Sequence, residues 1–338
     1  MKKNNLFLLI LVCCICLLSS CSKSNRFKID TKQNRVSVKI HRFDKDLLSL
    51  DTTHIKPEVV KLYKHYPEFM SVFADNVLNT QNSDTAEACK LFHEFLADKT
   101  YAPANKKAKE LYGGDITDLE TKISNAYTYI HHYFPEVQLP EVYFFVSGFN
   151  RQVLLSNKFI GIGTDFYLGN DFPLYKNLTY QYMIYNMRRE NLASDLVSAT
   201  LFRMFVMHST EDRLLDNMIF RGKVMYLLSV FMPDEKPEIL MGYSPEQWAW
   251  SKKYEKQVWT AIVDQKHLFS TDMQLINKYM NDAPFTSPIS QDSPGRLGTF
   301  IGWQVVKSYM EKNSKVGLKN LMDEENCQKI LEESGYKP

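Results

Sequence analysis

The chain has 338 residues, of which 44% are hydrophobic and 13% aromatic, and its formal net charge is +2. This composition is apolar enough for a packed core. Because Lys2 and Lys3 belong to an N-terminal segment that we expect to be removed, the remaining chain is nearly neutral, which excludes the broad basic surface used for nucleic-acid binding.

The N-terminus is typical of a bacterial lipoprotein signal. Two lysines precede an apolar stretch at 6–18, which is too short to span a bilayer, and small residues then lead to Cys21. The sequence Leu18-Ser19-Ser20-Cys21 predicts cleavage before Cys21 and acylation of its thiol. Each buried methylene contributes about 0.8 kcal/mol, so two or three chains would anchor the protein to a membrane. The alternative is an ordinary secreted protein with a chance cysteine at this site.

Three segments follow from this interpretation. Residues 1–20 are the signal peptide, the polar stretch 21–34 is a flexible tether, and 35–338 is a single domain.

The first half of the domain is predicted to be mainly helical. Residues 36–40 alternate apolar and polar side chains, which predicts a half-buried strand. Thr117 and Glu120 have the spacing of a capping box and predict the start of a long helix that ends near residue 134. Other helices are expected at 44–50, 57–80 (a pair), 84–95 and 103–112.

The second half contains two β-type runs, at 142–146 and 159–163, and then more helices. Residues 244–247, Ser-Pro-Glu-Gln, combine an N-cap, a first-turn proline and an N3 glutamine. Helices are expected at 192–207, 214–231, 244–265, 271–281, 294–312 and 324–333. The predicted fold class is therefore α+β, mostly α-helical, with a small mixed sheet of about three strands.

Cysteine usage argues against a redox or zinc–cysteine centre. Only Cys89 and Cys327 remain after the signal and Cys21, and no C-x-x-C motif is present. The two cysteines could pair in an oxidising compartment, but their spacing does not decide it.

The histidines do not complete a zinc-protease motif. His93-Glu94 starts one, but residue 97 is alanine, and the adjacent His131 and His132 point in different directions on a helix. His208, Glu211 and Asp212 resemble an inverted motif in which aspartate replaces the second histidine. Nucleotide-binding and nucleophile-elbow motifs are absent, and we expect no cofactor.

Two further patterns suggest packing or ligand contact. Gly295, Gly298 and Gly302 have helical spacing, which favours close helix packing over close approach of a ligand. The four tryptophans could line a binding cleft, although core packing is the better interpretation: Trp248, Trp250, Trp259 and Trp303.

Several segments, in order along nearly the whole chain, resemble the GldB-type gliding motility lipoproteins. The longest are at the C-terminal end: Asp282-Ala283-Pro284-Phe285, Pro294-Gly295-Arg296-Leu297-Gly298 and Ile301-Gly302-Trp303-Gln304-Val305-Val306. Earlier ones are Arg42-Phe43-Asp44, Tyr66-Pro67-Glu68-Phe69, Tyr133-Phe134-Pro135, Asp165 and Tyr167-Leu168-Gly169. The resemblance implies an envelope lipoprotein with a role in gliding.

That family is distantly similar to predicted zinc-dependent, zincin-like proteases, which implies a zincin-like layout with a metal helix near 192–207. On this comparison Ser198, Ala199 and Phe202 occupy the His-Glu-x-x-His positions, and Arg221 occupies that of a glutamate ligand. A guanidinium would repel a cation at this place. The resemblance therefore implies a degenerate site in a pseudoenzyme with no resident metal.

Three functions follow as hypotheses. The first is a non-catalytic lipoprotein of the gliding or associated secretion machinery, acting through envelope proteins. The second is a divergent metallopeptidase of the envelope that uses His208, Glu211 and Asp212. The third is a periplasmic module that binds peptide or glycan. By resemblance to other lipoproteins, Ser22 after Cys21 favours the outer membrane, and the lack of an acidic run after it favours the periplasmic face.

Overall fold

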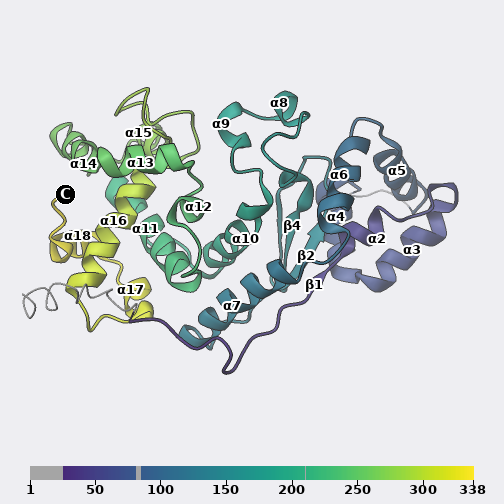
Figure 1. Ribbon diagram of the computed structural model, residues 1–338, viewed down its shortest axis with the longest axis horizontal. Helices are drawn as coiled ribbons and strands as arrows, with labels where there is room; N and C mark the ends of the chain where they lie inside the picture. The colour runs from purple at the N-terminus through teal and green to yellow at the C-terminus, as the bar shows by residue number, and fades with distance from the viewer. Residues whose placement is uncertain (1–25, 81–84, 210) are drawn as a thin grey trace, which may run out of the picture. The chain divides into compact units, whose positions relative to one another are not determined.

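The computed structural model describes residues 26–80, 85–209 and 211–338 (Figure 1). Two compact units are separated at residue 30, and every helix and strand described below belongs to the unit Thr31–Pro338. The signal peptide, Cys21 and the first residues of the proposed tether lie outside the described residues.

A small mixed sheet with the order β1-β2-β4-β3 lies within the unit Thr31–Pro338. Its strands are β1 (Ile40–His41), β2 (Glu141–Phe145), β3 (Val153–Leu155) and β4 (Phe159–Gly163). β2 pairs in parallel with β1 and β4, whereas β3 is antiparallel to β4. The α+β class with a small mixed sheet is confirmed, and the sheet has one more strand than the sequence indicated because three-residue β3 has no clear pattern.

The prediction of a strand over 36–40 is wrong for most of its length, because only Ile40 pairs within the sheet. The preceding backbone lies along the helix α7 (Thr117–Tyr133), where side chains four residues apart accept its N–H groups. These bonds are Val36 N to Thr128 Oγ1 (3.0 Å), Val38 N to Ser124 Oγ (2.9 Å) and Ile40 N to Glu120 Oε1 (3.1 Å). Two extended residues rise about 6.6 Å and four helical residues about 6 Å, so the two spacings match.

The predicted capping box at the start of α7 does not form. The N-cap is Ile116, whose side chain makes no capping bond, and Asp115 Oδ1 accepts from the N–H of Thr117 at 2.8 Å. Glu120 is unavailable for capping because it accepts the N–H of Ile40 and pairs with Lys39 at 2.9 Å.

The helices between β1 and α7 pack an aromatic cluster against the sheet. The ring of Phe69 stacks on Tyr143 of β2 with centroids 4.4 Å apart, and it also contacts Phe43 and Phe159. A Cβ on Gly161 of β4 would lie 2.7 Å from the Phe69 ring, so this position needs glycine. The helices are α2 (Phe43–Leu47), η1 (Thr52–His54), α3 (Ile55–His65), α4 (Pro67–Val77), α5 (Thr85–Ala97) and α6 (Ala102–Tyr112).

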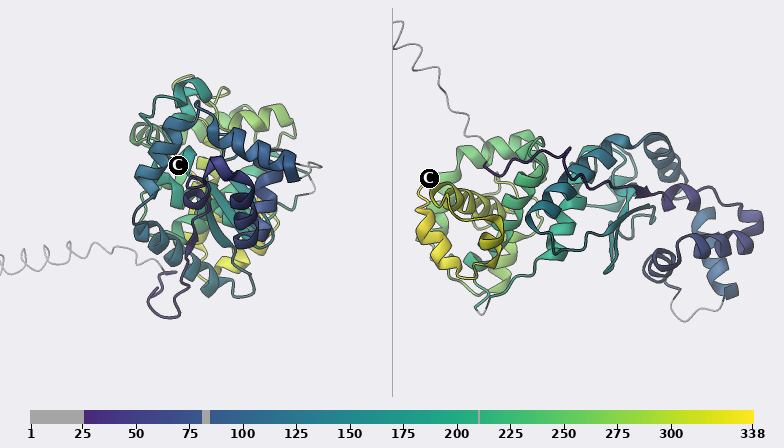
Figure 2. Two further views of the ribbon diagram at one scale, coloured as in Figure 1. Left: turned by 90° about the vertical axis from the view of Figure 1, so that its right-hand side faces the viewer. Right: turned by 90° about the horizontal axis from the view of Figure 1, so that it is seen from below.

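The C-terminal helices, green to yellow in Figures 1 and 2, gather around α11 (Leu214–Phe231) and α16 (Leu297–Lys312). These two helices make the closest helix pair, as the glycine pattern indicated. The remaining helices after β4 are η2 (Thr164–Phe166), α8 (Tyr175–Leu178), α9 (Gln181–Ile184), α10 (Arg189–Met204), α12 (Pro237–Met241), α13 (Pro245–Lys253), α14 (Glu255–Asp264), α15 (Met273–Met280), α17 (Leu318–Asp323) and α18 (Cys327–Ser334).

Most helix predictions in this half are confirmed with shifted ends. The range 214–231 matches α11, and the capping box of Ser244 and Gln247 forms, with bonds of 3.2 and 2.9 Å. The single helix expected over 244–265 is broken at Tyr254 into α13 and α14, and α17 was not predicted. No described helix has both the length and the apolarity to span a membrane.

The two described cysteines are buried thiols, and tryptophans of the C-terminal helices pack against other aromatic rings. Cys89 and Cys327 are buried and free, so they do not form a disulfide in this structure. Trp248 packs on Trp303 (5.8 Å between centroids), and Trp259 packs on Tyr336 (5.3 Å). None of the four tryptophans lines the candidate cavity below.

Candidate functional site

A cavity of about 360 Å³ brings together all four residues of the implied degenerate site. Ser198, Ala199 and Phe202 line it from α10, and Arg221 lines it from α11. The rest of the wall comes from α9 and its flanking loops, α12, the loop after α15 and the N-terminus of α16, with contributions from the start of β3 and from η2. The four positions that the family resemblance indicated therefore lie around one cavity.

Two polar side chains of the cavity wall, Gln152 and Asp195, are joined through the buried hydroxyl of Tyr167. Asp195 of α10 accepts a hydrogen bond from the Tyr167 hydroxyl at 2.9 Å, and Tyr167 accepts one from the Gln152 amide at 2.8 Å. Burial raises the pKa of Asp195 to about 6, while the Tyr167 bond and the charge of Arg296 oppose that rise. Asp195 thus sits where its charged form is costly unless a partner binds it.

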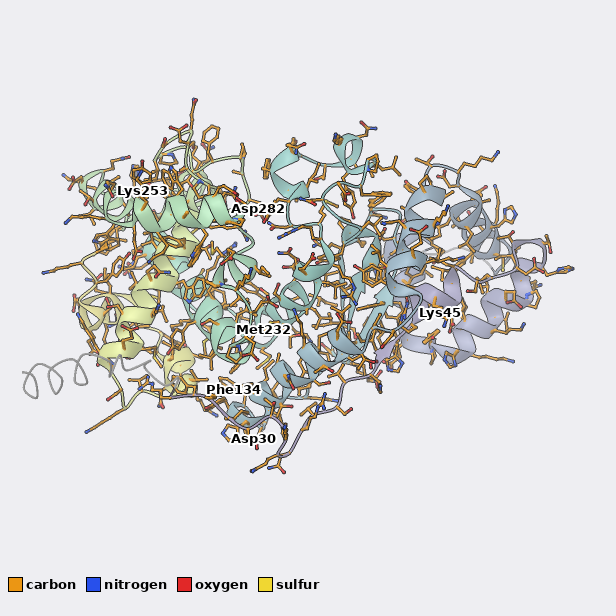
Figure 3. The ribbon with its side chains drawn as sticks, in the orientation of Figure 1. Asp30, Lys45, Phe134, Met232, Lys253 and Asp282 are labelled. Carbon is orange, nitrogen blue, oxygen red and sulfur yellow. The ribbon has the colours of Figure 1, made fainter. Side chains whose placement is uncertain are left out.

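Arg296 cross-links two parts of the cavity wall. It is the N-cap residue of α16 and has a left-handed backbone (φ 58°). Its Nη2 donates to the carbonyl oxygens of Met241 (2.5 Å) and Gly242 (3.1 Å), and its Nε pairs with Asp282 at 2.9 Å. In Figure 3, Asp282 lies just after α15, on the side of the C-terminal helices turned toward α9 and α10. Arg296 therefore has its charge neutralised by a neighbour.

Arg221 differs from Arg296 because its charge is not paired. Its Nη1 donates to the Met280 carbonyl at 3.3 Å, and within the described chain no carboxylate forms an ion pair with it. Burial, together with the nearby charge of Arg296, lowers the pKa of Arg221. The charge of Asp282 acts in the opposite direction, without forming an ion pair with Arg221. A guanidinium keeps its proton at neutral pH, so Arg221 presents a positive charge to the cavity with no carboxylate of the described chain bound to it.

Two buried oxygens in the same wall have no hydrogen-bond partner. One is Asn186 Oδ1, whose own Nδ2 donates to the Gly242 carbonyl at 2.7 Å and so fixes the orientation of the amide. The other is Thr299 Oγ1, in the first turn of α16, on a residue only 5% exposed. Buried polar groups are almost always bonded, so both atoms are unusual.

The chemistry of this wall suits recognition. Among the described residues that line the cavity are two carboxylates, two guanidiniums, an amide whose buried oxygen has no partner and a buried hydroxyl that has none, and no lining residue is a histidine or cysteine. Ser198 consequently has no adjacent imidazole to activate it as a nucleophile. The arrangement offers both a cation and acceptors to a ligand.

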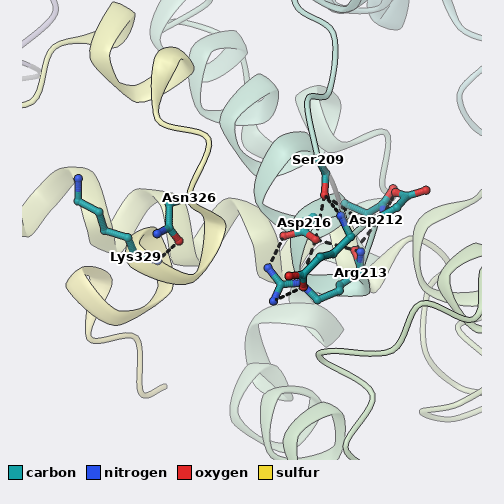
Figure 4. A network of polar contacts seen from close by, with 8 residues as sticks. Ser209, Asp212, Arg213, Asp216, Asn326 and Lys329 are labelled. Carbon is teal, nitrogen blue, oxygen red and sulfur yellow. Dashed lines mark hydrogen bonds and ion pairs between the residues drawn. The ribbon is translucent and has the colours of Figure 1, made fainter.

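The alternative set of ligands, His208, Glu211 and Asp212, is not assembled as a metal site. Glu211 pairs with Arg213 at 2.9 Å, and Asp212 accepts from the Asn217 amide at 3.0 Å. Figure 4 shows Ser209, Asp212, Arg213 and Asp216 close together at the start of α11, with dashed lines for the polar contacts among the residues drawn. Over 26–80, 85–209 and 211–338, no three His, Cys, Asp or Glu side chains gather closely enough to hold a metal ion.

The network continues to the start of α11 and into a second cavity of about 400 Å³. Arg213 binds both oxygens of Asp216 (3.0 and 3.1 Å), and Ser209 donates to the same carboxylate at 3.1 Å. Burial opposes ionisation of Asp216, but the bonds from Arg213 hold its pKa below the usual range. Burial lowers the pKa of Lys223, which donates to the Glu324 carbonyl at 2.5 Å. These contacts stabilise the helix start and satisfy its buried charges.

Sequence reasoning missed Asp195, Asn186 and Thr299 because no motif contains them. A signal existed for Arg296 and Asp282, since each lies in one of the C-terminal segments that carry the family resemblance. Tyr167 lies in another such segment and is the donor to Asp195. Three of the family segments therefore meet at this cavity.

The fold and the cavity define a mostly helical α+β protein with a cavity at α10, α11 and the start of α16 whose wall carries two arginines and two aspartates. Residues 24–338 match the family model of the gliding motility protein GldB, and the chain belongs to that family. Searches of curated proteins and of solved structures found no match. The zincin-like comparison accordingly has no support from a solved structure.

Proposed function

We propose that the protein is a non-catalytic lipoprotein of the gliding machinery or its associated secretion system, anchored by acylated Cys21 and acting through contacts with other envelope proteins. The observation that carries this proposal is the family match over residues 24–338. The lipobox at 18–21, which precedes the described residues, supports the anchor.

The proposal places the domain at the outer membrane on its periplasmic face. Ser22 after the acylated cysteine and the lack of an acidic run in 22–25 support this location. The neutral surface charge of the mature chain fits protein partners better than nucleic acid.

The anchor is tested by Cys21→Ser in the native host. We expect the variant to lose incorporation of labelled palmitate, to leave the membrane fraction and to fail to restore gliding in a deletion strain. Cys16→Ser is the matched control, because it removes a thiol of the signal region and leaves Cys21 in place. Full motility with a soluble Cys21→Ser protein would contradict the proposal.

The metallopeptidase hypothesis is tested separately. A metal ion at the cavity would have to approach the charge of Arg221, and the carboxylates of Glu211 and Asp212 are engaged by Arg213 and Asn217. Metal analysis of protein purified from membranes distinguishes a metallopeptidase from the proposed non-catalytic lipoprotein. Zinc at one equivalent that survives dialysis, with proteolysis that a chelator stops, would replace the proposed function.

A further inference from the structure

We propose that the cavity between α10, α11 and α16 binds the free carboxylate end of a peptide chain. The carboxylate lies on the Arg221 guanidinium and the Thr299 hydroxyl, and the last amide N–H donates to Asn186 or Asp195. This goes beyond the proposed function and does not depend on the lipid anchor.

The unpartnered oxygens are the first support. Leaving a buried hydroxyl or amide oxygen unbonded is costly, and a ligand that supplies the missing partner removes that cost. Thr299 Oγ1 can donate to an anion, whereas Asn186 Oδ1 can only accept. Thr299 Oγ1 could also accept, but a ligand with an anionic group beside an N–H satisfies both atoms at once.

The charge distribution identifies the anionic group. Arg296 is already bound by Asp282 and two carbonyls, so Arg221 is the guanidinium left for a ligand. Its planar donors match the two oxygens of a carboxylate. The first turn of α16, where Thr299 lies, adds the positive end of a helix dipole.

The acceptors exclude a simple inorganic anion. Asn186 Oδ1 and the carboxylate of Asp195 line the same cavity; they would repel sulfate, which has no donor, and the charge of Asp195 opposes the two negative charges of hydrogen phosphate. A peptide amide next to a terminal carboxylate supplies an N–H group at short range. The ligand class that meets both demands is an N-acyl α-amino acid, which is the last residue of any peptide chain.

The rest of the wall accepts an apolar side chain. Phe202 and Met183 are 42% and 39% exposed, and Met225 and Leu240 lie deeper. A volume of about 360 Å³ is at the small end for ligand sites, so it fits one or two residues of a peptide. The expected terminal residue is leucine, methionine or phenylalanine.

The test measures binding to the full chain purified from membranes in mild detergent. The probes are acetyl-Ala-Ala-Leu with a free carboxylate and the same peptide as its C-terminal amide. We expect the free acid to raise the melting temperature and bind measurably in calorimetry, and the amide to bind at least about tenfold more weakly because the charged hydrogen bonds are lost. Equal binding of acid and amide, or no binding of either, would overturn the proposal.

Two variants assign the contact to this cavity. Arg221→Gln should weaken acid binding by about tenfold or more, and Thr299→Val by about fivefold, on the scale of one charged and one neutral hydrogen bond. Arg189→Gln is the control, because Arg189 pairs with Asp118 and does not line the cavity. Unchanged binding by both cavity variants would overturn the assignment.

Thr299→Val also separates a binding role from a structural one. Valine has the shape of threonine without the unpartnered hydroxyl, so the ligand-free variant should melt at the same or a higher temperature while it binds the acid less well. If Thr299→Val melted at a lower temperature and bound the free acid with unchanged affinity, the Thr299 hydroxyl would be structural, and its role in binding the carboxylate would be overturned.

Further probes identify the source of the carboxylate. If acetyl-leucine binds as tightly as the tripeptide, the natural ligand is a small N-acyl amino acid. If the tripeptide binds more tightly, the ligand is the end of a peptide chain. Either result supports recognition of a carboxylate next to an amide N–H. Inorganic phosphate that stabilises the protein as much as the free acid would overturn it. Because these measurements use isolated protein, their failure is distinguishable from failure of the Cys21 test.

Discussion

Gly222 and Gly302 bring two helix backbones into direct contact where α11 crosses α16. A Cβ on Gly222 would lie 2.3 Å from the carbonyl carbon of Gly302, and a Cβ on Gly302 would lie 1.9 Å from the Met218 carbonyl oxygen. Gly222 follows Arg221, and Gly302 lies one turn after Thr299. The contact therefore fixes the separation of the two cavity walls that carry the cation and the free hydroxyl.

Gly302→Ala should destabilise the fold, because the added methyl group meets backbone that cannot move aside. Overpacking of this kind typically costs about 1–3 kcal/mol or more, and the free energy of unfolding from urea denaturation measures it. Gly114→Ala is the control, since nothing lies within 4 Å of its Cβ, and it should be neutral or slightly stabilising. Equal stability of wild type and Gly302→Ala would refute the backbone contact.

The bonds between α7 and the extended segment at 36–40 support a second prediction. Ser124→Ala removes the hydroxyl that accepts the buried Val38 N–H, which should cost about 1–3 kcal/mol and increase protease cleavage around residue 38. Thr121→Ala on the same helix is the control, because its hydroxyl accepts none of these three bonds. If the two variants were equally stable and equally resistant, α7 would not be what holds the segment.

In the segment 36–40 the extended backbone could be predicted from the sequence, but its hydrogen-bond partners could not. Alternation at 36–40 indicates an extended backbone with one buried side, and the structure confirms that much. It does not indicate what pairs with the backbone: here the partners are side chains of α7, and only Ile40 and His41 join the sheet. Glu120 carried a second ambiguity, because a capping glutamate and a glutamate that binds a distant N–H have the same local sequence.

The helices and the two main strands could be predicted because their signals are local: apolar periodicity, caps and breakers. The family resemblance placed Ser198 and Arg221 on neighbouring helices, and both line the cavity. Asp195 and Thr299 could not be found this way. Asp195 matters because it is buried in the cavity wall, and Thr299 because its hydroxyl has no partner among the described residues; both depend on segments about 100 residues apart in the chain.

Asp165 predicts a pH dependence of stability. The residue is 1% exposed; its Oδ2 accepts from the N–H groups of Ser147 (3.0 Å) and Phe149 (2.8 Å), and its Oδ1 has no partner. Burial outweighs these bonds and raises the pKa from 3.8 to about 6. The folded state then holds a proton that the unfolded state has released, so stability falls as the pH rises from about 4 to about 6.

The size of this effect is about 3 kcal/mol, because a tenfold change in proton affinity corresponds to about 1.4 kcal/mol. Asp165→Asn should make the fall in stability between pH 4 and 6 smaller, with the contribution of Asp195 remaining, and the variant should be at least as stable as wild type at pH 7.5. Urea denaturation across that range measures it, with the exposed Asp292→Asn as control. A variant curve parallel to that of wild type would show that Asp165 does not titrate in this range.

The thiols give a test that covers both the core and the lipid anchor. Burial and the nearby charge of Asp216 raise the pKa of Cys327 to about 12, and Cys89 is buried with 6% exposure. At pH 8 a thiol with that pKa is thiolate about once in 10⁴ molecules, so the folded protein should react very slowly with iodoacetamide.

After denaturation without reductant, protein purified from membranes should show two reactive thiols by mass spectrometry, because Cys89 and Cys327 are free and Cys21 is held in a thioether. Three reactive thiols would contradict acylation of Cys21. None would mean that Cys89 and Cys327 pair in the cell, where an oxidising compartment allows it. Rapid labelling of the folded protein at Cys327 would show instead that the second cavity opens to solvent and that the thiol is not protected by burial.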